Sequence, residues 1–79
     1  MITLVRAKIN YSELRRICLA EIRQWPGCET VGGLQLIRDA SPSGFSINIT
    51  LYGLADKKTA DRAKVFVERV NRRQYQLIG

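Results

Sequence analysis

The sequence has no histidine, only two cysteines and no long apolar run, and each shortage removes a class of protein. Without histidine, Cys18 and Cys28 cannot supply the four ligands that structural zinc normally requires. No apolar stretch approaches the roughly 20 residues of a membrane-spanning helix, so we expect no membrane segment. Because cytosolic thiols stay reduced, we expect two free cysteines rather than a disulfide.

The sequence also lacks the groups on which familiar enzymes depend, namely paired acids and bases, an activated nucleophile or a cofactor cradle. Gly32-Gly33 is too short for a phosphate-binding loop. Cys28 follows Pro26-Gly27 in an expected loop, where the alternatives are a reactive thiol and a half-buried structural one. With no histidine to activate it, we expect the structural role. The sequence predicts a non-enzymatic protein with no cofactor and no small-molecule site.

The composition is that of an ordinary globular protein. Hydrophobic residues make up 46% of the 79 residues and charged residues 25%, which predicts a single domain over 1–79. Arg6 and Lys8 follow the short apolar start instead of preceding it, so we find no export signal and expect a cytoplasmic protein. The net charge of +6 favours nucleic acid, acidic proteins or anionic surfaces as partners.

Two segments have the periodicity of amphipathic helices. The first is expected over residues 11–25, after an N-cap at Asn10 that Glu13 can complete. Its apolar stripe comprises Leu14, Ile17, Cys18, Ile22 and Trp25. The second is expected to begin after Ala55 or Asp56 and to end near Tyr75 or Leu77. Its apolar stripe comprises Ala63, Phe66, Val67, Val70 and Leu77.

Between these segments, residues 31–38 and 45–51 are expected to form strands joined by the turn-rich residues 39–44. In the second strand Phe45, Ile47, Ile49 and Leu51 alternate with Ser46, Asn48, Thr50 and Tyr52. The first set should face the core and the second should form a polar face. The expected fold is α+β, two amphipathic helices around an antiparallel β-hairpin, in the order α-β-β-α. If residues 2–9 add an edge strand to the hairpin, the order becomes β-α-β-β-α.

Glu21 breaks the pattern of its helix because it lies in the middle of the apolar stripe. A buried carboxylate needs a partner or a raised pKa. As a functional group it would carry a proton or anchor a ligand, but the sequence offers no second catalytic group nearby. We therefore expect a position at the rim, paired with an arginine or with backbone donors.

The second helix carries the basic residues most suited to binding phosphate or acidic partners. They are Lys57, Lys58, Arg62, Arg69, Arg72 and Arg73. A solvated helix face is the simpler interpretation of the same pattern. The sequence Lys57-Lys58-Thr59-Ala60 is similar to the start of the last helix in double-stranded-RNA-binding domains, and this resemblance implies phosphate contacts. Asp61 stands where that family would carry further positive charge, and its third strand is missing here.

A wider resemblance runs through Leu19-Ala20-Glu21, Trp25-Pro26-Gly27-Cys28-Glu29, the glycine-bounded hairpin and the last helix. These features resemble small uncharacterised bacterial proteins of similar length. The resemblance implies the fold outline and a bacterial cytoplasmic setting, and it implies no activity.

Two functional hypotheses follow from the sequence. The first is a protein-interaction or self-associating module that uses the open sheet face or the surface near Val65 and Tyr75, and a homodimer is one form of it. The alternative is nucleic-acid binding through the basic face of the second helix. We favour the first because Asp61 and Glu68 interrupt the basic residues and no base-reading surface is evident.

Overall fold

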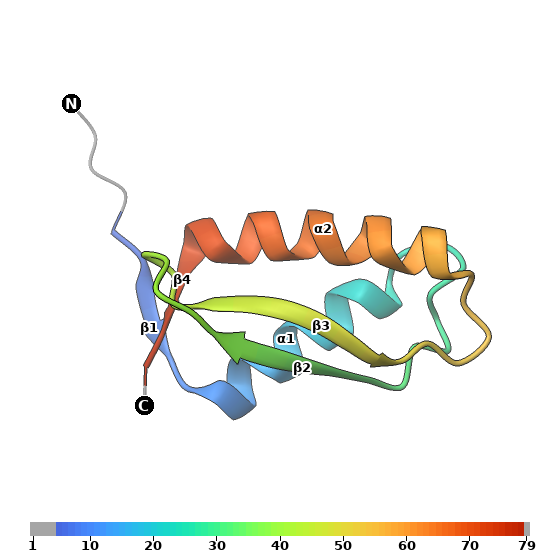
Figure 1. Cartoon of the computed structure of the whole chain (residues 1–79), viewed down its shortest axis with the longest axis horizontal. Coiled ribbons are helices and arrows are strands. Elements are labelled where there is room, and N and C mark those ends of the chain that lie inside the picture. The colour runs from blue at the N-terminus through green and yellow to red at the C-terminus, as the bar shows by residue number, and fades with distance from the viewer. Residues whose placement is uncertain (1–4, 79) are drawn as a thin grey trace.

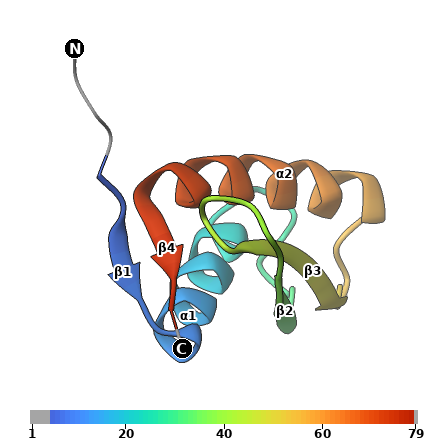
Figure 2. The same ribbon diagram turned by 60° about the vertical axis from the view of Figure 1, so that its left-hand side comes forward.

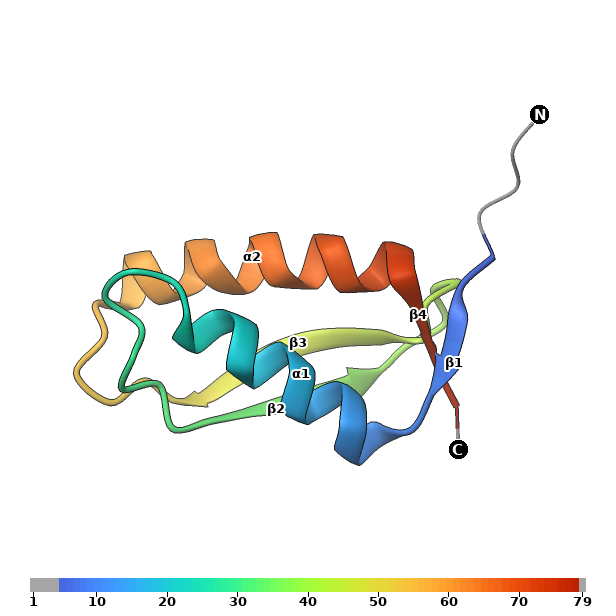
Figure 3. The ribbon, with the colours of Figure 1, turned by 180° about the vertical axis from the view of Figure 1, so that it is seen from behind.

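The computed structural model describes residues 5–78 and has the element order β-α-β-β-α-β, which confirms the predicted α+β class and adds one strand. Helix α1 (Tyr11–Arg23) and helix α2 (Lys57–Gln74) pack on one side of the antiparallel hairpin formed by β2 (Gly33–Arg38) and β3 (Phe45–Leu51). α1 lies against β2 and α2 against β3, and the helices also contact each other (Figures 1 and 3). The other face of the hairpin has no element covering it among the described residues.

Both helices begin at the residues that the sequence indicates. The side chain of Asn10 accepts a hydrogen bond from the backbone N–H of Glu13, and that of Asp56 accepts one from the N–H of Thr59. These bonds satisfy donors that a helix leaves unpaired in its first turn. Of the two capping residues expected for α2, Asp56 is the one that forms the cap.

Residues 7–9 do form a strand, as the second of the two fold orders required, but this strand does not join the hairpin. Residues 2–4 of the expected strand lie outside the described part of the chain, and β1 (Ala7–Ile9) pairs in parallel with β4 (Tyr75–Leu77). Figure 2 shows these two short strands side by side at one end of the molecule. α2 ends at Gln74, one residue before Tyr75, so the earlier of the two expected ends is close and an end at Leu77 is wrong. Leu77 is buried, but in a strand.

The alternation of β3 is confirmed up to Ile49 and then reverses. Ile49 pairs with Leu34 and Leu51 pairs with Gly33, so Thr50 is an extra residue in β3. Such a bulge turns the following side chains to the opposite faces. Leu51, predicted to be buried, is 62% exposed. Tyr52 was predicted on the polar face, but its hydroxyl donates a hydrogen bond to Asp61 Oδ1 on α2, at 2.9 Å.

Gly53 lies in the turn after β3, in a left-handed backbone conformation that favours glycine. Its φ is +64°, and a Cβ atom at this position would lie 2.1 Å from the carbonyl oxygen of Thr30. A side chain would therefore push apart the turn after β3 and the loop before β2. Next to Gly53, the N–H of Leu54 donates to Thr30 Oγ1 at 2.8 Å, so the turn that leads into α2 is bound to the loop before β2.

The core lies between the hairpin and the two helices. Its fully buried side chains include Phe45, Leu14, Ile22, Val31 and Val67. In α2 the buried stripe runs through Ala60, Ala63, Val67 and Asn71. It shares Ala63 and Val67 with the predicted stripe but is rotated by roughly 60° from it, which leaves Phe66 at the outer margin. Phe66, predicted to be in the apolar stripe, is 53% exposed as a result. The helix therefore presents part of its apolar surface outward.

Candidate interaction surface on the second helix

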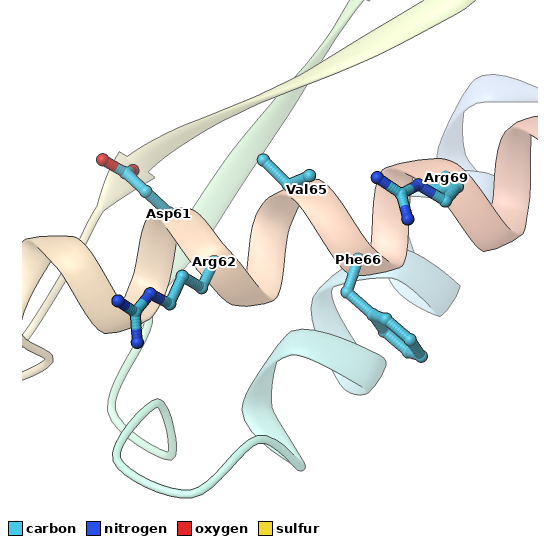
Figure 4. A pocket seen from close by; sticks show the side chains of 5 residues that line it. All are labelled: Asp61, Arg62, Val65, Phe66 and Arg69. Atoms are coloured by element: carbon cyan, nitrogen blue, oxygen red, sulfur yellow. The ribbon is translucent and has the colours of Figure 1, made fainter.

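The outer side of α2 carries a shallow groove in which apolar side chains are exposed between arginines. Asp61, Arg62, Val65, Phe66 and Arg69 line this groove, whose volume is about 340 Å³ (Figure 4). Val65 is 49% exposed and Phe66 53%. Exposed apolar side chains that adjoin one another are characteristic of interaction sites. We call Arg62, Val65, Phe66 and Arg69 the α2 outer patch.

Phe66 is held in place by an aromatic neighbour. Its ring centroid lies 5.4 Å from that of Trp25, with a tilt of 56° between the rings. Trp25 follows the end of α1 and is itself only half-buried. Tilted pairs at this separation are favourable beyond the area that they bury. The outer patch thus has a fixed aromatic side and needs little ordering when a partner binds.

Asp61 is the acidic side chain that lines the groove beside the arginines, and its carboxylate forms a hydrogen bond outside the groove. It accepts the hydrogen bond from Tyr52, and Figure 4 shows its carboxylate turned toward the strands and away from Arg62. If the phenol of Tyr52 ionised, it would lose the proton that it donates to Asp61 and would place a second negative charge beside that carboxylate. The hydrogen bond to Asp61, together with burial, therefore raises the pKa of Tyr52. Asp61 therefore leaves the positive charge of Arg62 available to solvent.

A second groove, of about 390 Å³, adjoins the first toward the end of α2. It shares Val65 and Arg69 with the outer patch and is otherwise lined by Arg6, Glu68, Arg72 and Arg73. Four arginines against one glutamate make it strongly positive. Arg6, which leads into β1, was not among the residues predicted from the sequence. The β1–β4 pairing brings it to the end of α2, and no local pattern could have indicated this contact.

Arg72 forms contacts within the protein through both its side chain and its carbonyl oxygen. Its Nε donates to Ser43 Oγ at 3.1 Å, and its Nη1 lies 3.8 Å from Glu68 Oε1. Its carbonyl oxygen accepts a hydrogen bond from Arg6 Nε at 2.6 Å. Arg72 therefore joins the hairpin turn, α2 and the lead into β1. It contributes charge to the second groove, whereas Arg69 and Arg73 are the exposed donors.

The structure does not gather all six predicted basic residues into one site. Lys57 and Lys58 are exposed at the start of α2, and Arg73 lies sixteen residues further along the helix, roughly 24 Å away. The sheet beside this helix has two strands, so the resemblance to RNA-binding domains at Lys57 and Lys58 gains no third strand from the described residues. The two lysines are separate from the arginine groove.

Glu21 has a partner, although it is neither an arginine nor a backbone donor, which were the expected partners. Its Oε1 accepts a hydrogen bond from Asn71 Nδ2 at 3.1 Å, and Asn71 is fully buried in α2. Glu21 itself is half-buried between the helices. The contact is structural because it links α1 to α2. The sequence did not indicate Asn71, since a single polar residue in a helix has no pattern that marks it as buried.

The two cysteines are free and buried. Cys18 lies in the core, where burial, followed by the charges of Glu21 and Glu68, raises its pKa to about 12. Cys28 is also inaccessible, whereas a half-buried position was expected, and burial together with Glu29 raises its pKa. Both thiols therefore lack the accessible thiolate that reactive cysteines need.

The outer edges of the hairpin are capped by side chains from the helices. On β2, Tyr11 Oη accepts from the N–H of Leu36 at 3.2 Å, and Arg15 Nε donates to the carbonyl of Leu34 at 2.9 Å. On β3, Glu68 Oε2 accepts from the N–H of Ile47 at 2.7 Å. These bonds occupy two backbone groups of β2 and one of β3, which makes pairing with another strand less favourable. The polar face itself, with Ser46, Asn48 and Thr50, is open as predicted.

Within residues 5–78, no three His, Cys, Asp or Glu side chains are grouped so that they could hold a metal ion. No helix in the same range has the length and apolarity to cross a membrane. Comparison of the sequence with protein-family models and curated proteins, and of the structure with solved structures, gave no match.

Proposed function

We propose that this chain is a protein-interaction module whose α2 outer patch binds a partner protein. The observation that carries the proposal is the exposure of Val65 and Phe66 between Arg62 and Arg69. Aromatic residues and arginine are the types enriched at protein interfaces. The hydrogen bonds at the hairpin edges disfavour self-association through strand pairing between two copies.

Nucleic-acid binding is the second candidate, and the arginines of the second groove favour it. Against it, the apolar centre of the outer patch offers nothing to a phosphate backbone. Phe66 is the single aromatic residue among those that line the two grooves, whereas single-strand binders stack successive bases on several rings. We therefore place protein binding first.

The test compares the unmodified protein with Val65→Ser/Phe66→Ser in capture from a nuclease-treated extract of the source cells. The matched control is Ile37→Ser, because Ile37 is 46% exposed on the opposite side of the hairpin. We expect the retained partner to be lost with the double variant and kept with the control. Retention by all three proteins would show that the outer patch is not the binding surface.

A parallel titration with single- and double-stranded DNA and RNA separates the two candidates. Fluorescence anisotropy at low and moderate salt should show no binding that depends on Arg69 and Arg73. Affinity that falls log-linearly with salt and is abolished by Arg69→Glu/Arg73→Glu would replace our proposal with nucleic-acid binding.

A further inference from the structure

Resting on the proposed function, we infer that the partner segment is an acidic amphipathic helix that lays one apolar ridge along the α2 outer patch. Arg62 and Arg69 stand seven residues apart on α2, with Val65 between them. Seven residues are two helical turns, or roughly 10 Å. A partner helix that carries carboxylates at positions i and i+7 reproduces this spacing. Apolar residues at i+3 and i+4 would then lie over Val65 and Phe66.

The charges around the patch select an acidic segment over a neutral one. The second groove extends the positive surface from Arg69 toward Arg6 and Arg73. Its acidic member, Glu68, has only 20% of its side chain exposed and is bound to Arg72 and to the backbone of Ile47. A basic segment would therefore meet unpaired arginines, whereas an acidic one gains charge-assisted hydrogen bonds.

The apolar centre of the patch favours binding of an amphipathic acidic helix over binding of other polyanions. Val65 and Phe66 occupy the space between Arg62 and Arg69, so a ligand that spans both arginines must cover apolar surface. A sugar-phosphate backbone would leave that surface in water, and an amphipathic helix buries it. Burial of the apolar side chains provides affinity, and the two charge pairs at the rim set orientation and salt dependence.

The experiment uses three synthetic peptides of about four helical turns, identical except at two positions seven residues apart. These positions carry Glu, Gln or Lys, and binding to the full chain is measured by fluorescence anisotropy at low and moderate salt. We expect the Glu peptide to bind most tightly and to weaken as salt rises. Arg62→Glu/Arg69→Glu should weaken that peptide by on the order of tenfold and should reverse the preference in favour of the Lys peptide.

The matched control is Lys57→Glu/Lys58→Glu, which changes the net charge equally on the same helix but away from the patch. This variant should keep the order of the three peptides. Circular dichroism verifies that each variant is folded, and Arg62→Gln/Arg69→Gln serves if the charge reversal prevents folding.

The outcomes separate the inference from the proposed function. If the Gln peptide binds as tightly as the Glu peptide, and Val65→Ser abolishes both, the patch binds proteins but the acidic partner is wrong. If Val65→Ser/Phe66→Ser leaves the binding of all peptides unchanged, both ideas are overturned. If none of the peptides binds, the acidic helical partner is wrong, and the capture experiment decides whether the outer patch binds a protein.

Discussion

Asn71 Nδ2 donates to Glu21 Oε1 at 3.1 Å, and this bond joins α2 to α1 inside an otherwise apolar contact. The same Nδ2 donates to the carbonyl of Val67 at 2.9 Å. A buried polar group that loses its partner costs about 1–3 kcal/mol. The bridge therefore favours one relative position of the two helices, and through it one position of the α2 outer patch.

Asn71→Asp should destabilise the fold at neutral pH by on the order of 2 kcal/mol or more. The introduced carboxyl would be buried beside Glu21, which raises its folded-state pKa above the unfolded value. The protonated carboxyl therefore makes its full contribution to stability at pH values below its unfolded-state pKa. That contribution is lost as the pH rises through its folded-state pKa. Urea denaturation from about pH 4 to about pH 8 should show the deficit, relative to the unmodified protein, growing with pH.

Two controls accompany this measurement. Asn71→Leu removes the hydrogen bond without adding charge, so its deficit should be nearly independent of pH. Glu21→Gln keeps an amide oxygen as acceptor for Asn71 and should change stability by less than about 1 kcal/mol. A Glu21→Gln protein that stays folded but loses the peptide binding described above would give Glu21 a functional role after all.

Ile47→Ala should cost about 2–5 kcal/mol because Ile47 is a core residue of β3, only 3% exposed. Leu51→Ala, four residues later on the same strand, should change stability by less than about 0.5 kcal/mol. The difference arises because the bulge at Thr50 turns Leu51 toward solvent. Chemical denaturation measures both, and an equal cost at the two sites would contradict the register described here.

Tyr11→Phe should cost about 0.5–1.5 kcal/mol, since it removes the acceptor for the backbone N–H of Leu36 while keeping the ring. The same change exposes part of the β2 edge and should increase self-association at high protein concentration. Denaturation and sedimentation velocity give the two readouts. Tyr75→Phe is the control, because Tyr75 lies in the separate β1–β4 sheet. A Tyr11→Phe protein with unchanged stability would show that this bond does not matter.

Both thiols should react with a thiol reagent only as fast as the protein unfolds. Cys18 and Cys28 are fully buried, and their raised pKa values keep them protonated at neutral pH. Mass spectrometry after labelling with and without urea measures the protection, and Cys18→Ala and Cys28→Ala proteins assign it to each site. Fast labelling of Cys28 in the native protein would restore the reactive role considered from the sequence.

Local patterns in the sequence determined much of this fold. Helical periodicity located α1 and α2, and the caps at Asn10 and Asp56 marked their first turns. The alternation of β3 gave the correct buried face from Phe45 to Ile49. These features depend on residues only a few positions apart, which is the range over which backbone geometry and side-chain direction repeat.

Local sequence patterns predicted only part of the candidate site. Arg62 and Arg69 were predicted as surface donors and Val65 as exposed, but Phe66 was assigned to the core and Arg6 to no site. Tyr75, expected to be exposed beside Val65, is half-buried in β4. Which part of a broad apolar stripe becomes buried depends on the angle at which the helix meets its neighbours.

The sequence by itself determined the helices, the hairpin and the excess of positive charge, because each follows from local spacing or from composition. Only the tertiary structure decided that Ala7 pairs with Tyr75, that Asn71 reaches Glu21 and that Phe66 lies outside the core. These contacts join positions far apart in the chain or depend on how whole elements pack. Their energies come from packing and hydrogen bonds formed after the elements meet, and no local pattern encodes them.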